Sequence, residues 1–325
     1  MILNYYSNHI NYDGRKIGLV FDVDFGSFGF ESLTNNLGRL EVAGGRIYYR
    51  PLYYGSIPVL RNAAVGASFV TDFAYGIEGG PDTRVSEWGV DAELPLIKAG
   101  WWNLNLYTDY ASIVDYGSGT AAGIATDIEM LGGFIKAGMN VERRWLGKSF
   151  VPNFFGPFYE VLRYTAKAEL VEYYISYGGD STGIPSQVQA AAPGDPVMKH
   201  TLLPMLTKDR KGWFSGLYVD FLHLVRAVGM YERLDTEPNS GTLHLAASLS
   251  QSIPFLALEA SYNKRSLESF EDIFTLDYRS VSRVGVGYKI RPWLILYCDY
   301  IWNFEWDKQL KQYRPQERIQ PRISL

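Results

Sequence analysis

The sequence lacks several features that mark common protein classes. It has one cysteine, Cys298, which excludes a disulfide framework and any metal cluster built from cysteines. Its net charge is −4 and no stretch is rich in Lys and Arg, so binding to nucleic acid is not expected. No run of about 18 apolar residues occurs, which excludes a transmembrane helix. Paired strands could still cross a bilayer, because they satisfy their backbone groups laterally.

Groups that would carry catalysis or hold a metal are also few. The four histidines are His9, His200, His223 and His244. None of them forms an HExxH or comparable ligand pair. His244 precedes Ser248 and Ser250 on one face of a predicted strand, yet no third group completes a nucleophile, a base and an orienting residue. We therefore expect no metal, no cofactor and no enzymatic activity.

The clearest pattern in the sequence lies near its end. From Val284 to Ile290 every second residue is apolar, and after Arg291 and Pro292 the alternation resumes at Leu294. A period of two predicts strands with one apolar and one polar face, here joined as an antiparallel hairpin. The second strand is longer than most strands of soluble proteins. It ends in four aromatic residues that we interpret as a girdle at a membrane–water interface: Tyr300, Trp302, Phe304 and Trp306.

The same alternation recurs along most of the chain and predicts an all-β fold. Near the amino terminus, for example, Leu19, Phe21 and Val23 alternate with Asp22 and Asp24. Fifteen strands are predicted, at residues 16–25, 28–35, 41–51, 62–72, 88–94, 101–113, 121–130, 134–145, 213–221, 224–234, 242–251, 255–263, 284–290, 294–306 and 318–325.

The connections between these strands alternate between short and long. Short ones are predicted near residues 26, 52–59, 95–100, 130–131, 222–223, 252–254 and 291–292. Long ones are predicted near 36–40, 73–83, 114–120, 147–210, 235–240, 266–278 and 307–316. Outer-membrane barrels have short periplasmic turns and longer extracellular loops, whereas a β-sandwich has no reason to alternate in this way.

The number of strands follows from the direction of the first one. It runs into a short turn, so a preceding strand is expected, of which residues 1–7 would be a remnant. Because barrels of a single bacterial chain have even numbers of strands, we predict about 16, with 14 as the alternative if residues 114–130 are irregular. The same argument, together with the absence of a recognisable signal peptide, predicts that upstream residues are missing. Residues 1–325 are taken as one barrel domain.

One segment, residues 147–210, interrupts the alternation for about 60 residues. Long segments without regular structure are usually functional or disordered. The aromatic first half is expected to fold against or into the barrel, and the Gly- and Pro-rich part at 178–196 is expected to be mobile. This segment would be an extracellular or lumen-folded loop and a possible contact for a protein partner.

The polar faces of the predicted strands carry charges of both signs. The residues predicted to line a lumen are Asp22, Asp24, Arg46, Arg50, Asp91, Glu93, Asp109, Lys136, Glu142, Arg144, Asp220, Arg283, Lys289 and Asp299. Two interpretations are open. The charges line a water-filled pore, which is the usual geometry at this strand number, or they fill a closed interior with ion pairs.

The repeated hairpins, the aromatic girdle and the rhythm of short turns and long loops resemble Gram-negative outer-membrane β-barrel proteins in general. The resemblance covers most of residues 13–325 outside 147–210. It implies an up-and-down transmembrane barrel in the bacterial outer membrane, in contact with lipid.

Two functions are compatible with this resemblance. The first is a porin-like channel for small hydrophilic solutes, with residues 147–210 as a constriction. The second is a non-conducting barrel that anchors a surface or secretion assembly. A soluble β-sandwich is the alternative outside the membrane classes. The resemblance is architectural and carries no substrate with it.

Overall fold

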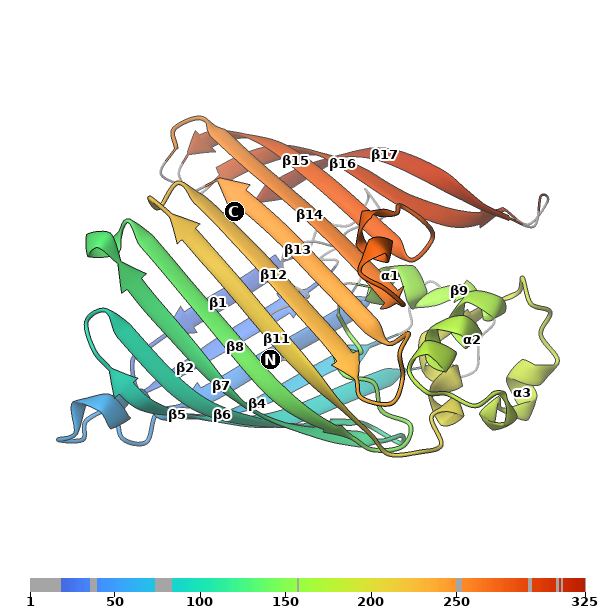
Figure 1. Cartoon of the computed structure of the whole chain (residues 1–325), viewed down its shortest axis with the longest axis horizontal. Helices are drawn as coiled ribbons and strands as arrows, with labels where there is room; N and C mark the ends of the chain where they lie inside the picture. The colour runs from blue at the N-terminus through green and yellow to red at the C-terminus, as the bar shows by residue number, and fades with distance from the viewer. Residues whose placement is uncertain are drawn as a thin grey trace. The chain divides into compact units, whose positions relative to one another are not determined.

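The computed structural model describes residues 19–35, 40–73, 84–156, 158–249, 253–291, 294–307, 310 and 312–324. Most of these residues belong to one antiparallel sheet, and a small helical segment interrupts it between β8 and β11 (Figure 1).

The sheet contains fifteen strands among the described residues. They are β1 (Leu19–Asp24), β2 (Phe28–Thr34), β3 (Val42–Tyr49), β4 (Ala64–Asp72), β5 (Val85–Lys98), β6 (Trp102–Ile113), β7 (Ser118–Met130), β8 (Ile135–Leu146), β11 (Arg210–Phe221), β12 (Val225–Leu234), β13 (Gly241–Leu249), β14 (Leu256–Leu267), β15 (Ser280–Arg291), β16 (Leu294–Asp307) and β17 (Gln312–Ser324). Each strand lies beside the strands that precede and follow it in the sheet, and β8 is adjacent to β11.

The all-β, antiparallel prediction is confirmed, and each of the fifteen predicted stretches coincides with a strand. The weakly alternating residues 121–130 belong to a regular strand, β7, so they are not irregular. The last strand begins at Gln312, six residues before the predicted start. The sixteenth strand expected from residues 1–7 lies outside the described residues.

The chain forms two compact units, and each is described by itself. Unit 1 comprises Met1–Lys98, Asn103–Ile124 and Glu142–Lys211, and unit 2 comprises Ala99–Trp102, Ala125–Val141 and Gly212–Leu325. Unit 1 therefore holds β1 to β5, nearly all of β6 and the helical segment. Unit 2 holds β12 to β17 and most of β11.

Four predicted connections differ from the structure in position or length. The tight turn predicted at residues 95–100 lies at 99–101, because β5 continues through Pro95 to Lys98, with a register shift between Pro95 and Ile97. The connection predicted to be long at 307–316 is short, because β16 ends at Asp307 and β17 begins at Gln312. The supposedly tight connection after β3 is instead a longer one that includes a 3-10 helix, Pro58–Asn62. The supposedly long connection after β6 is a tight turn at residues 114–117, closed by the Ile113 amide donating to Gly117 O at 2.8 Å. The alternation of lengths is therefore a tendency and not a strict rule.

The two faces of the sheet are the reverse of those in a water-soluble protein. In β15 the side chains of Val284, Val286 and Tyr288 point outward, and Val286 is 49% exposed. On the opposite face of the same strand lie Arg283 and Lys289, which are buried, Arg283 being only 4% exposed. We call these the apolar face and the polar face. A water-soluble sheet with one solvated face has polar side chains on that face.

Unit 1 shows the same reversal. Trp88, Val90 and Leu94 of β5 are exposed at alternate positions, while Glu87 and Asp91 lie on the opposite face. Pairing keeps the faces in register, because Phe69 of β4 lies opposite Trp88 and is exposed as well. Contiguous exposed apolar surface of this kind marks contact with lipid or with another protein.

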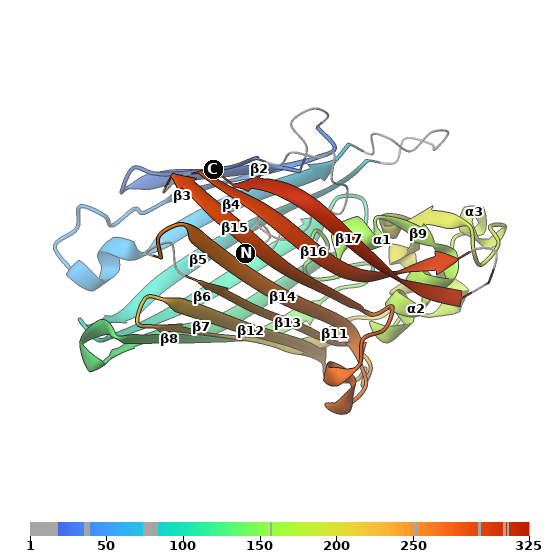
Figure 2. The ribbon, with the colours of Figure 1, turned by 90° about the horizontal axis from the view of Figure 1, so that it is seen from above.

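The segment between β8 and β11, which we call the insertion (residues 147–209), contains regular structure. Its elements are α1 (Tyr159–Leu162), β9 (Tyr164–Ala166), α2 (Lys167–Ser176), a 3-10 turn (Ser181–Gly183), α3 (Ser186–Gln189), β10 (Pro196–Met198) and a 3-10 helix (Lys199–Met205). They gather in one part of the molecule (Figure 2). Among the described residues, no helix has the length and apolarity needed to cross a membrane.

The insertion has its own apolar core. Phe154, Leu162 and Leu170 are completely buried, and so are Leu202 and Leu203. The rings of Phe154, Phe155 and Tyr159 lie 4.6–5.6 Å apart, within the range of favourable aromatic contacts. In the Gly- and Pro-rich part, whose mobility remains a prediction, Lys167 Nζ donates to Ala191 O at 2.7 Å.

Candidate functional site

The polar face of unit 1 carries arginines that bridge carboxylates on neighbouring strands. Arg46 of β3 donates from Nη1 to Glu31 Oε1 of β2 at 3.1 Å. It also donates from Nη2 and Nε to Asp91 of β5, at 2.5 and 3.1 Å. Gly66 of β4 lies beneath this pair, where a Cβ would approach an Asp91 oxygen to 2.5 Å. The absence of a side chain at Gly66 therefore makes room for the bridge.

A second bridge lies on unit 2. Arg283 of β15 donates to Glu259 Oε2 of β14 at 2.9 Å and to Asp299 Oδ2 of β16 at 3.4 Å. Tyr297 donates its hydroxyl to the other oxygen of Glu259 at 2.8 Å. Positive and negative charges thus alternate across three adjacent strands of the polar face.

The predicted lining residues fall into two groups. Four pairs are brought together: Arg46 with Asp91, Arg50 with Asp24, Glu142 with Arg144, and Arg283 with Asp299. Six predicted residues remain. They are Asp22, Glu93, Asp109, Lys136, Asp220 and Lys289. The assignment of these fourteen residues to a lumen remains a prediction.

Most of these six residues contact residues outside the predicted set. Glu93 accepts from Asn105 at 2.7 Å, and Lys136 lies 3.4 Å from Glu129. Asp220 lies 3.5 Å from His223, and Lys289 Nζ donates to Ile253 O at 2.8 Å. Asp22 is exposed on β1.

Sequence reasoning missed several residues of the polar face. Glu31 and Glu87 are absent from the predicted lining. The two faces of the strand predicted at 28–35 are not assigned, and the strand predicted at 88–94 begins one residue after Glu87. Glu87 precedes Gly89 and Asp91 at the same spacing of two, so the alternation contained the signal. His244, which the sequence placed near Ser248, instead contacts Asn263 Oδ1 through Nδ1 at 2.6 Å.

The predicted girdle lies on β16. Tyr300, Trp302 and Phe304 share the apolar face with Leu296, and the rings of Tyr300 and Trp302 are 4.0 Å apart, edge to face. Tyr300 also hydrogen-bonds Glu317 of β17. Trp306 lies opposite Tyr313 in the register, but its side chain is outside the described residues. The location of these residues at a membrane interface remains a prediction.

The insertion is joined to the end of β4 through a buried charged group. Arg163 donates from Nε and Nη2 to the two oxygens of Asp72, at 2.6 and 2.7 Å, and from Nη1 to Glu41 Oε2 at 2.9 Å. Tyr159 donates its hydroxyl to Asp72 Oδ2 at 2.5 Å. Asp72 is completely buried. Bidentate pairing of this kind is strong and directional, so it sets the position of α1 against the sheet.

Two other cations hold the insertion together. Lys199 is buried, donates to Phe154 O at 2.6 Å and lies 4.6–5.5 Å from the centres of the Phe154, Tyr159 and Tyr173 rings. Arg210 donates to Gly147 O at 3.1 Å and to Tyr177 O at 2.9 Å. Because Gly147 and Arg210 bound the insertion, this contact brings its two ends together.

The start of the insertion lies directly on β7 and the turn before it. A Cβ on Gly119 would come within 2.5 Å of the Phe150 ring, and one on Gly117 within 1.9 Å of Lys148 O. Both glycines therefore allow residues 148–150 to approach the sheet closely. Phe150 also borders a cavity on the polar face of unit 1.

Burial changes the titration of His200, in the 3-10 helix of the insertion. Burial lowers the pKa of His200 from 6.5 to about 4, and the nearby carboxylate of Asp72 opposes the shift only in part. Its ring contacts Tyr116 at a centroid distance of 6.2 Å. His200 is therefore neutral at pH 7.

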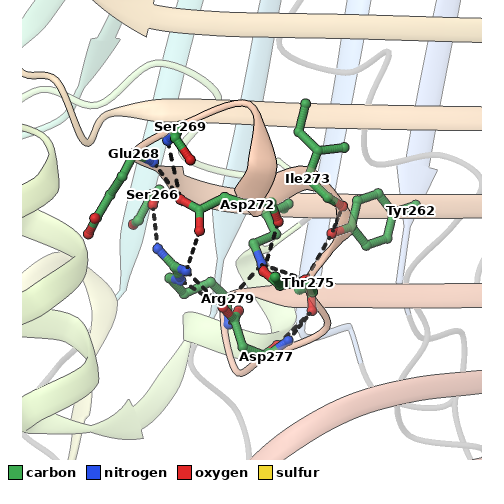
Figure 3. Close-up of polar contacts among 11 residues, drawn as sticks. Tyr262, Ser266, Glu268, Ser269, Asp272, Ile273, Thr275, Asp277 and Arg279 are labelled. Atoms are coloured by element: carbon green, nitrogen blue, oxygen red, sulfur yellow. Dashed lines mark hydrogen bonds and ion pairs between the residues drawn. The ribbon is translucent and has the colours of Figure 1, made fainter.

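The connection between β14 and β15, residues 268–279, is held by polar contacts (Figure 3). Arg279 donates to Asp277 at 2.8 Å, to Asp272 at 3.3 Å and to Ser266 O at 2.9 Å. Burial by itself would raise the pKa of Asp277, but hydrogen bonds from Arg279 and Lys264 lower it overall. The backbone amide of Glu268 lowers the pKa of Asp272 in the same way.

No protein-family model matches the chain, and no curated protein matches it in sequence. Solved structures with a similar arrangement include the outer membrane protein Omp33 of Acinetobacter baumannii, with 8% identity, coverage of 88% of this chain and 90% of that one, and a TM-score of 0.33. OccK8 (OprE) of Pseudomonas aeruginosa is 10% identical, with coverage of 94% and 78% and a TM-score of 0.38.

OprB of Pseudomonas putida is 5% identical, with coverage of 88% and 86% and a TM-score of 0.36. Omp33 is by name an outer-membrane protein. With TM-scores below 0.5 and identities of at most 10%, these similarities do not by themselves assign a function to the chain.

Proposed function

We propose that the chain is a β-barrel of the bacterial outer membrane and a porin-like channel for small hydrophilic solutes. The observation that carries this proposal is the reversal of the two faces. Val286 is exposed, whereas Arg283, three positions earlier and on the opposite face of the same strand, is buried. Lipid requires an apolar exterior, and a water-filled interior tolerates charged side chains.

The insertion supplies the proposed constriction of this channel. Its anchor at Asp72 and Glu41 is buried and bidentate, which suits a segment that keeps one position while solutes pass. Phe150 of the insertion borders the cavity on the polar face, which supports contact between the insertion and solutes.

The first test is single-channel conductance of the purified protein in a planar bilayer. Stable conductance steps are expected, and deletion of residues 148–209 with a short linker should enlarge them. Steps of unchanged size would argue against a constriction by the insertion. A silent bilayer, from protein shown to be folded by heat-modifiable gel migration, would contradict the channel.

A silent result would favour the second candidate function, a non-conducting anchor for a surface assembly. One observation supports this alternative. The connection between β14 and β15 displays Phe270 and Phe274 at 75% and 77% exposure on a segment held by polar contacts. Exposed aromatic side chains are common in protein interfaces.

The single cysteine gives an independent test of the membrane location. Cys298 of β16 is exposed on the apolar face. A fluorophore attached there should be quenched by lipids that carry nitroxides on their acyl chains and not by iodide in the aqueous phase. The reverse result would favour a soluble protein.

A further inference from the structure

The cavity on the polar face of unit 1 lies between the strands and the start of the insertion. Its volume is about 70 Å³. Glu87 and Asp91 of β5, Asp109 of β6, and Glu142 and Arg144 of β8 supply its charged lining. One water molecule needs about 10–15 Å³ of volume measured in this way, so the cavity has room for a small polar group.

Two of these carboxylates are buried without full hydrogen bonding. Glu87 is 1% exposed and Glu142 is 2% exposed. Among the residues that the structure describes, neither Glu87 Oε2 nor Glu142 Oε2 has a hydrogen-bond partner. Glu142 is bonded to Arg144 through its other oxygen only. Buried carboxylate oxygens without a donor are costly, so both atoms indicate a ligand that donates hydrogen bonds.

Acidic groups outnumber basic ones around the cavity. Asp91 and Asp109 lie directly opposite each other on β5 and β6, an arrangement that is unfavourable for like charges. Arg46 reaches Asp91, and Arg144 reaches Glu142. Four carboxyl groups therefore face two guanidinium groups, and the ammonium group of Lys199 also acts on Glu87, so acidic groups exceed basic ones by one.

The shape of the lining favours an organic cation over a metal ion. Metal ions need oxygen ligands converging within about 2.6 Å of one point. Among the described residues, no three acidic or histidine side chains are placed to do so. An ammonium or guanidinium group instead spreads three to five donors over several acceptors. Phe150 adds an aromatic side chain to the border of the cavity.

We propose that this cavity binds a small organic cation through an ammonium or guanidinium group, with Glu87 and Glu142 as acceptors. The proposal deepens the proposed function and rests on it in one respect, because the bound cation would be a solute of the channel. The binding itself does not require conduction.

The experiment is calorimetric titration of the folded, full-length protein in detergent with methylguanidinium chloride at constant ionic strength, with sodium chloride as the reference salt. We expect saturable binding to the wild type that sodium does not displace. Glu87→Gln should weaken it at least tenfold, since the amide keeps the shape of the side chain and cannot form a carboxylate when the cation binds. Asp115→Asn, which removes an exposed carboxylate in the turn after β6, should leave it unchanged.

Several results would overturn the proposal. They are the absence of saturable binding to the wild type, binding by Glu87→Gln as tight as that of the wild type, and a loss of affinity in Asp115→Asn as large as that in Glu87→Gln. If gel migration shows that Glu87→Gln does not fold, Glu142→Gln takes its place as the test. Binding by a protein that is silent in the bilayer would refute the channel and keep the cation site. Conductance by a protein that does not bind methylguanidinium would refute the cation site and keep the channel.

Discussion

The insertion and the connection between β14 and β15 are both long excursions from the sheet with several aromatic residues, yet they are stabilised in different ways. The insertion buries Phe154, Phe155 and Tyr159 in a core of its own. The connection exposes Phe270 and Phe274 and is held by Asp277, Asp272 and Arg279 instead. Aromatic content alone therefore does not show whether a segment forms a core.

The difference has a consequence for how each segment responds to change. A buried apolar side chain makes many contacts, so truncating it leaves a cavity and lowers the free energy of unfolding by several kcal/mol. A partly exposed polar cluster contributes less per contact, because water competes for its groups. The predictions below test this contrast in order of expected effect.

The largest effect is expected from Phe154→Ala. Its fully buried ring leaves a cavity, and truncations of this type cost about 3–5 kcal/mol. Hydrogen exchange followed by mass spectrometry should show that the free energy of local opening falls by this amount in peptides from 150–206. The matched control is Phe274→Ala, which should change peptides from 267–280 by less than about 0.5 kcal/mol. Equal effects would contradict the contrast.

The second effect is expected from Arg163→Met, which leaves the buried carboxylate of Asp72 without its bidentate partner. Breaking such a pair costs about 3 kcal/mol or more. Protease cleavage within the insertion should accelerate, and the connection between β14 and β15 should not change. Adding Asp72→Asn should restore part of the loss. A double variant as sensitive as the sum of the two single variants would argue against a direct interaction.

A third expectation concerns pH. The pKa of His200 is about 4 when folded and 6.5 when unfolded, so the unfolded state binds more protons between these values. The stability of the insertion should be complete above pH 6.5 and fall as the pH drops toward 4, by on the order of 2 kcal/mol. Hydrogen exchange at pH 7 and 5, corrected for the intrinsic rate, measures this change. His200→Gln should remove it.

The connection between β14 and β15 should respond in a lower pH range. The lowered pKa values of Asp272 and Asp277 stabilise it above pH 3.8, and this contribution is lost as the pH falls below that value. The smallest effect is expected from Asp277→Asn at pH 7, about 1 kcal/mol, confined to peptides from 267–280. A change spread over the insertion would contradict the separation of the two segments.

Much of the sheet could be predicted from the sequence because alternation is a local property of a strand. Residues 284–290 show their two faces without reference to any other part of the chain, and the structure places them as expected. Errors arose where a strand departs from the ideal, as at Pro95, where the register shifts and the strand continues. The short turn at 114–117 was also missed, because its length depends on how far β6 and β7 extend.

The candidate site was less predictable, because it depends on contacts between distant residues. Arg163 and Asp72 are 91 positions apart, and nothing local to either residue indicates the pair. Glu87 could have been found by extending the alternation of β5 backward by one step. The cavity beside it could not, since it requires knowing that Phe150 lies against Gly119.

The contact of Arg210 with Gly147 has an evolutionary consequence. The chain leaves and returns to the sheet at nearly the same place, between strands that are already neighbours. A segment bounded in this way can be lengthened, shortened or exchanged without disturbing the strand order on either side. Related chains could therefore diverge here first, and the same two residues mark where a foreign peptide could be grafted.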